Sequence, residues 1–321
     1  MTTTSPRNPL ATAYGLGRRR ERTHTFTLIT WIAIGVLVLM IVGVVVGPAV
    51  DPGYDPTGQD LSSANLGFFA SSATGAFHPL GTDQLGTDTL SQLIAGGRVS
   101  ILIAFAATAI AAVIGPLAGV SAGYFGGAVD RVVSALVEVL LAVPRILVII
   151  TVVAVFGSSI PLLIVLLGTT GWAGYARIVR AQALSLKERE FVDAAVSMGA
   201  NKVRILIRHI LPQTFNSIVV LASLDLGGVV VTESALSYLG LGVRPPATSW
   251  GLLIQTAQAS MQTEPRLLFL PSIALILFVL SCNFVARIFT SESGDSRRRL
   301  RPKRATSKNP PANVLPTESE I

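Results

Sequence analysis

TLITWIAIGVLVLMIVGVVVG, residues 27–47, is a run of apolar and small side chains without a single charge. An α-helix rises 1.5 Å per residue, so roughly 20 such residues cross the hydrocarbon core of a bilayer. The run therefore predicts a membrane-spanning helix. It is too long for the apolar core of a cleaved secretory signal, and no convincing small-residue cleavage site accompanies it, so we expect a retained anchor.

Five further runs have the same character, each bounded by polar residues, proline or glycine. They cover residues 99–123, 132–156, 161–179, 215–239 and 267–288. Closed β-barrels are built from short strands that alternate apolar and polar residues, whereas these runs are long and continuous. The sequence therefore predicts an all-α polytopic membrane protein with six transmembrane helices.

The composition excludes several classes of protein. Of 321 residues, 50% are hydrophobic and 13% charged, and the mean hydropathy is +0.61, which is far above that of a soluble domain. Cys282 alone cannot form an intrachain disulfide, and the three histidines lack the spacing of a metal site. A phosphate-binding loop, a catalytic triad and paired carboxylates outside the membrane are all missing from the sequence. We expect a protein that is not an enzyme and holds no cofactor or metal.

Lysine and arginine are distributed unevenly along the chain. With both termini in the cytoplasm, 21 of the 25 basic residues face inward. Arg98, Arg244 and Arg266 then face outward, and Arg145 lies within a span. Because basic residues favour the cytoplasmic side, this asymmetry predicts six helices with both ends inside.

The same pattern divides the chain into segments. Residues 1–26 and 291–321 are predicted to be disordered basic cytoplasmic tails, 27–47 the first helix, and 48–97 an extracytoplasmic segment. Residues 98–290 form a five-helix core that includes a cytoplasmic loop at 181–213. The basic run at 297–304 is interpreted as a topology signal, with binding to anionic membrane lipids as the alternative. It has no interleaved aromatic residues, so nucleic-acid binding is not expected.

The cytoplasmic segment KEREFVDAAVSMGANKVRILIRHILPQ, residues 187–213, carries a helical pattern. Phe191, Ala195 and Met198 recur at i, i+4 and i+7, which predicts a short amphipathic helix. Gly199 follows the last apolar position, where a left-handed residue commonly ends a helix. A second periodic set leads to Pro212, which suits the first turn of the next helix. Periodicity alone leaves two interpretations open, a helix on the membrane surface or a docking element for a partner.

The residues at these positions closely resemble the EAA signature of ABC-importer permeases. The match consists of Glu190, Ala194, Ala195 and Gly199, followed by Ile210, Leu211 and Pro212. Residues 78–101 and 234–251 are similar to the dipeptide and oligopeptide branch of that family, and the resemblance covers roughly residues 28–289. Two departures weaken the inference of substrate: Thr87 stands where the branch commonly has arginine, and an arginine-rich tail replaces its acidic ending.

The resemblance implies a MetI-like permease subunit of an ATP-driven peptide importer in a bacterial cytoplasmic membrane. It implies as partners a second permease, two cytoplasmic ATPases that hydrolyse ATP with Mg²⁺, and an external binding protein. It further implies that one set of residues docks the ATPase, with Glu190 in polar contacts, the two alanines in close packing and Gly199 in the turn. That set is Glu190, Asp193, Ala194, Ala195, Met198, Gly199 and Pro212.

Four charged residues lie within predicted spans, where a charge costs about 2.5 to 3.5 kcal/mol unless it is paired or lines a cavity. Glu138 and Arg145 are seven residues apart along the third run, and Asp225 and Glu233 are eight apart in the fifth. The spacing predicts that each pair shares one face of its helix. Two interpretations stay open, a translocation pathway or structural pairing with neighbouring helices.

Two other functions compete with a peptide importer. A secondary transporter driven by protons would use Glu138, Asp225 and Glu233 as its carriers. An importer of the same branch for nickel or another non-peptide solute would share every motif above.

Overall fold

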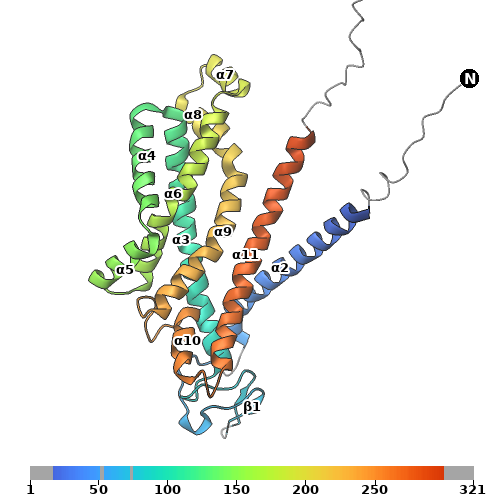
Figure 1. Ribbon diagram of the computed structural model, residues 1–321, viewed down its shortest axis with the longest axis vertical. Helices are drawn as coiled ribbons and strands as arrows, with labels where there is room; N and C mark the ends of the chain where they lie inside the picture. The colour runs from blue at the N-terminus through green and yellow to red at the C-terminus, as the bar shows by residue number, and fades with distance from the viewer. Residues whose placement is uncertain (1–16, 51–53, 73–74, 300–321) are drawn as a thin grey trace, which may run out of the picture.

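The computed structural model describes residues 17–50, 54–72 and 75–299 (Figure 1). Its long helices are α2 (Gly17–Val50), α3 (Thr89–Phe125), α4 (Gly127–Ala142), α5 (Arg145–Phe156), α6 (Ile160–Leu186), α9 (Leu211–Tyr238) and α11 (Arg266–Arg299). Shorter elements are η1 (Leu61–Ser63), α7 (Glu190–Ser197), α8 (Lys202–Ile205), the π-helical turn η2 (Leu206–Ile210), α10 (Trp250–Ala257), η3 (Gln258–Ser260), and the strands β1 (Ala70–Ser71) and β2 (Phe77–His78). The predicted all-α membrane fold is confirmed.

Within the described part of the chain, five helices are long and apolar enough to cross a membrane, and a bent pair makes up to six. The bent pair is α4 and α5, which meet at 83°. The prediction of one continuous helix over 132–156 was therefore wrong. Pro144 is the cause, because proline pushes the preceding residue out of the helical conformation, and Val143 is accordingly extended.

The first and last long helices extend beyond their predicted bounds. α2 begins at Gly17 and α11 continues to Arg299, so both run into segments predicted to be disordered tails. The remaining parts of those tails, 1–16 and 300–321, lie outside the described residues. In Figure 1 both helices run upward, toward the end of the molecule that carries α7 and α8, although α2 diverges from the bundle.

The centre of the bundle is the pair α3 and α6, which pack along a row of glycines. Gly115, Gly119 and Gly123 repeat every four residues and so lie on one face of α3. A Cβ on Gly119 would stand 2.4 Å from the carbonyl oxygen of Ala176, closer than any real contact. Small residues at this spacing let membrane helices approach until their backbones touch.

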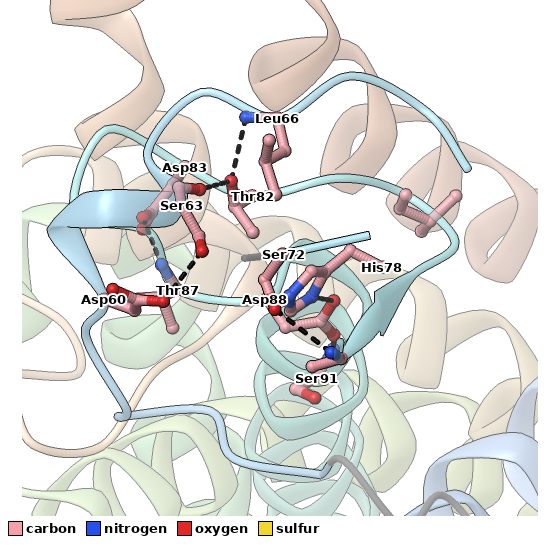
Figure 2. Close-up of polar contacts among 12 residues, drawn as sticks. Asp60, Ser63, Leu66, Ser72, His78, Thr82, Asp83, Thr87, Asp88 and Ser91 are labelled. Atoms are coloured by element: carbon pink, nitrogen blue, oxygen red, sulfur yellow. Dashed lines mark hydrogen bonds and ion pairs between the residues drawn. The ribbon is translucent and has the colours of Figure 1, made fainter. Parts of the chain in front are cut away.

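The end of the bundle opposite α7 carries a small polar cap, built from residues 54–72 and 75–88 with the hairpin β1–β2 (Figure 1). Figure 2 shows Asp88 between two partners: its carboxylate accepts a hydrogen bond from the backbone N–H of Ser91 at 2.7 Å and pairs with His78 Nδ1 at 2.8 Å. Asp88 thus caps α3 and ties the hairpin to it. Arg266 at the start of α11 donates to the carbonyls of Leu80 and Thr82 and holds the cap from the other side.

Candidate functional site

The short helix α7 lies at one end of the bundle and is anchored by one face only. Val192 and Ala195 are buried, in a cluster with side chains of α3, α6 and α8. Both acidic residues of its first turn, Glu190 and Asp193, are exposed and suit the positive end of the helix dipole. The helix therefore packs against the bundle through Val192 and Ala195, and its opposite face is exposed in this chain.

That opposite face is partly apolar. Met198 is 80% exposed and Val196 55%, and Phe191 and Ala194 are also exposed. Large apolar side chains that gather beside charged ones at a surface commonly mark a contact with another protein. The surface of α7 formed by Glu190, Phe191, Asp193, Ala194, Val196 and Met198 is called the docking face below.

Four residues of the predicted set, Glu190, Asp193, Ala194 and Met198, belong to the docking face, but Ala195 does not. Ala195 was predicted to pack against a partner, but it is 1% exposed and contacts its own chain. The predicted stripe of Phe191, Ala195 and Met198 is thus split, because only Ala195 points inward. Val192 provides the second anchor, and its position three residues before Ala195 is the helical spacing that could have identified it.

Gly199 ends α7 in the manner predicted. Its φ is +76°, in the left-handed region that favours glycine. Its N–H donates to the carbonyl of Val196 at 2.9 Å, and that of Ala200 donates to Ala195 at 3.0 Å. These two bonds form a Schellman motif, so the chain reverses sharply after α7.

The chain then continues as one long helical segment. Residues 202–238 comprise α8, η2 and α9, and Pro212 lies in the first turn of α9 as predicted. Because proline lacks an N–H and its ring crowds the preceding turn, the wider π turn at Leu206–Ile210 is where the helix accommodates it. Pro212 is exposed but lies a helical segment away from the docking face.

A polar cluster lies inside the bundle where α5, α6 and α9 meet. Arg145 Nη1 is 3.8 Å from Asp225 Oδ1, and the Tyr175 hydroxyl donates to Asp225 Oδ2 at 3.2 Å. Arg145 also donates to Thr170 Oγ1 at 3.0 Å and to the carbonyl of Leu167 at 2.5 Å. The side chains of Arg145 and Asp225 are 27% and 20% exposed, so the pair is partly open to its surroundings.

Glu138 does not join this cluster. It is exposed on α4, whereas Arg145 begins α5, so the prediction that they share one helical face was wrong because of the break at Pro144. A second pair was missed by sequence reasoning: the guanidinium of Arg180 on α6 binds the carboxylate of Asp130 on α4 through two nitrogens. Asp130 was not recognised because it lies before the predicted start of the third span.

Glu233 is fully buried in a cage of serines. Ser237 donates to its carboxyl at 2.7 Å and Ser100 of α3 at 2.9 Å. Ser249 bonds to Ser237 at 3.2 Å, and the N–H of Trp250 donates to Ser100 at 3.2 Å. The network joins α3, α9 and α10, which supports the structural interpretation of Glu233 over a place on a pathway.

Replacing Glu233 with alanine should therefore lower stability. The change leaves the Ser100 and Ser237 hydroxyls without their acceptor, at a cost of about 1 to 3 kcal/mol for each buried group. Thermal unfolding in detergent would measure the shift, and Glu233→Gln, which keeps an acceptor, should lose less. Equal melting temperatures for wild type and Glu233→Ala would contradict the assignment.

These features define a class of protein, a polytopic helical membrane protein with a firmly anchored surface helix at one end and an ion pair within the bundle. The chain belongs to the family of binding-protein-dependent transport system inner membrane components, whose model matches residues 115–291. It is thus the non-enzymatic permease component of an ABC importer, and works with an ATPase and a substrate-binding protein.

Known proteins agree with this membership. The chain is 39% identical over 209 residues to the oligopeptide transport system permease protein OppC of Haemophilus influenzae, covering 65% of this chain and 67% of that protein. It is 38% identical over 208 residues to the glutathione transport system permease protein GsiD of Pectobacterium atrosepticum, covering 65% and 69%. An inward-facing structure of the MetNI methionine ABC transporter matches with a TM-score of 0.50 and 21% identity, over 62% of this chain and 95% of that one, which supports the MetI-like fold.

Proposed function

We propose that this permease imports peptides across a bacterial cytoplasmic membrane. The observation that carries the proposal is the 39% identity to an oligopeptide permease, together with 38% identity to a glutathione permease. Both relatives are named for peptide cargo, and glutathione is itself a short peptide. Each similarity covers 65% of this chain, so cargo is inferred from that part of it.

The proposal includes an arrangement of subunits. The docking face of α7 would contact a cytoplasmic ATPase, with Glu190 and Asp193 in polar contacts and Met198 in an apolar one. A second permease would complete the pathway, and two ATPases would hydrolyse ATP with Mg²⁺. The binding protein would deliver peptide to the polar cap at the opposite end of the bundle. Both termini would lie in the cytoplasm, which agrees with the excess of basic residues on that side. This chain itself would bind no cofactor.

The cluster of Arg145, Tyr175 and Asp225 is the best candidate for the translocation pathway. A peptide carries an ammonium group at one end and a carboxylate at the other, and the cluster offers one charge of each sign. Arg145 and Asp225 are 3.8 Å apart, longer than a direct hydrogen bond, and partly exposed, so each could exchange its partner for a charged end of a passing peptide. A pathway fed by a binding protein needs such weak contacts, because tight binding would stop transport.

The first experiment is to isolate the tagged chain from its native membrane in mild detergent and identify the proteins that accompany it. We expect a second permease and one or two ATPases. Uptake of a labelled tripeptide should be lost in a strain without this chain and restored by it. If the chain restored uptake of nickel but not of peptide, the cargo would be a metal ion and not a peptide. If the chain were isolated alone and its flux were driven by a pH gradient, the protein would be a proton-coupled transporter and not an importer subunit.

Asp225→Asn should reduce peptide uptake by about tenfold or more. The substitution leaves Arg145 without its counter-ion inside the membrane, where an unpaired charge costs about 2.5 to 3.5 kcal/mol. Uptake by cells that carry the variant would be compared with that of Glu138→Gln, which removes an exposed carboxylate away from the cluster. Co-purification of the ATPase should be unchanged in both. Loss of the assembled transporter in Asp225→Asn alone would instead assign the ion pair a structural role.

A further inference from the structure

A polar pocket lies between the C-terminal end of α6 and the start of α9, at the end of the bundle that carries α7 (Figure 1). Its volume is about 430 Å³, within the range of small-molecule sites, which is roughly 300 to 1,000 Å³. Its polar lining residues are Gln182, Ser185, Arg189, Gln213, Asn216 and Ser217. All six lie outside the docking face and outside the cluster of Arg145, Tyr175 and Asp225.

The pocket continues a line of polar contacts that starts at this cluster. Tyr175 and Gln182 are seven residues apart on α6, so they share one face of the helix and lie roughly 10 Å apart along its axis. Each bonds to α9: the Tyr175 hydroxyl donates to Asp225, and Gln182 Nε2 donates to Ser217 Oγ at 2.6 Å. An extended chain rises about 3.3 Å per residue, so three residues of a peptide span this interval.

The pocket also holds polar groups whose bonding capacity is unused in this chain. Gln182 Oε1 is buried, and no group in the described part of the chain donates a hydrogen bond to it. Arg189 is exposed, and among the described carboxylates none forms an ion pair with it. The pocket therefore offers an open hydrogen-bond acceptor and an open cation.

We propose that this pocket is an exit site that holds the backbone of an imported peptide before release, with the C-terminal carboxylate on Arg189. The inference rests on the proposed import of peptides and adds a second site to the pathway. A peptide backbone alternates N–H donors and C=O acceptors, and the carboxamides of Gln182, Gln213 and Asn216 offer both kinds of group. Arginine binds a carboxylate through two parallel hydrogen bonds. Because the amides contact only the backbone, the site accepts peptides of many sequences.

A helix of the second permease is the competing occupant. Such a helix would bury all six polar side chains of the pocket, and each would then need a polar partner to avoid the cost of desolvation. An aqueous passage meets the same groups with water and with peptide in turn. The polar lining therefore favours a passage over a contact between subunits.

The test labels a thiol in the intact purified transporter. Cys282 is the only cysteine of the chain and is buried, so Ser185→Cys adds one exposed thiol, within the pocket. Its reaction with a small methanethiosulfonate reagent would be followed on this chain by mass spectrometry. Trialanine at twice its dissociation constant should slow labelling about threefold, by simple occupancy. The control is Glu188→Cys, because Glu188 is exposed beside the pocket but does not line it.

Two further comparisons test the assigned contacts. Trialanine amide lacks the carboxylate, so protection should need about tenfold more of it, and Arg189→Gln should remove this difference. Gln182→Leu should reduce peptide uptake by about tenfold with normal co-purification of the ATPase, whereas Gln182→Asn, which keeps a carboxamide, should retain more.

Two results would overturn the proposal. If Ser185→Cys did not react in the intact transporter, another subunit would cover the pocket. If trialanine left its labelling rate unchanged, the pocket would not hold peptide. Neither result bears on import itself, because uptake of a labelled tripeptide by cells tests that separately.

Discussion

Gly199→Val should abolish ATP-driven uptake, reducing it by more than tenfold, while the protein still inserts into the membrane. At φ +76° a β-branched residue is strained by about 1 to 3 kcal/mol, and the two hydrogen bonds that end α7 depend on this conformation. Relief of the strain would turn the docking face away from its partner. Uptake by cells, with membrane-inserted protein measured in the same samples, would test this result.

The control for this variant is Gly127→Val. Gly127 begins α4 with φ +58°, so valine there meets a similar backbone strain without touching α7. We expect Gly127→Val to retain more uptake and normal co-purification of the ATPase, whereas Gly199→Val should lose both. If the two variants lost uptake equally while both retained the ATPase, general strain rather than docking would explain the defect.

Gly119→Leu should have the largest effect on stability. The new Cβ would stand 2.4 Å from the Ala176 carbonyl oxygen and 3.0 Å from its Cα, and backbone atoms cannot move aside as a side chain can. Overpacking of this kind costs about 1 to 3 kcal/mol and more when a rigid helix must shift. We expect little folded protein after extraction in detergent, as measured by size-exclusion chromatography and thermal unfolding.

The matched variant is Gly35→Leu. Gly35 lies within α2, and a Cβ there would meet nothing within 4 Å. It should fold and melt like the wild type, since leucine suits a membrane helix. A stable Gly119→Leu protein would mean that α3 and α6 do not pack as described.

The sequence was most informative where a feature depends on residues that are close together in the chain. Apolar length alone identified the long helices, because the bilayer requires about 20 residues whatever the neighbours are. The role of Gly199 was equally clear, since a glycine directly after an amphipathic run commonly ends the helix in the left-handed conformation, as Gly199 does. The family membership of the core also follows from motifs within a single segment.

The remainder depended on contacts between distant segments. The break at Pro144 could not be told from a kink, because prolines at Pro116 and Pro271 lie inside intact helices. Ser237 lies one turn from Glu233, but Ser100, the partner that joins Glu233 to α3, is 133 residues away, so the local pattern did not reveal the cage. Likewise, Ala195 and Ala194 are adjacent and identical, and the positions of α3, α6 and α8 decide which of them is buried.

The helical segment 202–238 has a mechanical consequence. At 1.5 Å per residue its 37 residues form a rod about 55 Å long, which begins beside α7 and ends past Glu233. A continuous helix of this length would act as a lever, so that a displacement beside α7 would return as tilt at the serine cage and α10. The π turn at Leu206–Ile210 is the irregular part of the segment, so the regular lever arm would begin at α9, where Pro212 lies in the first turn.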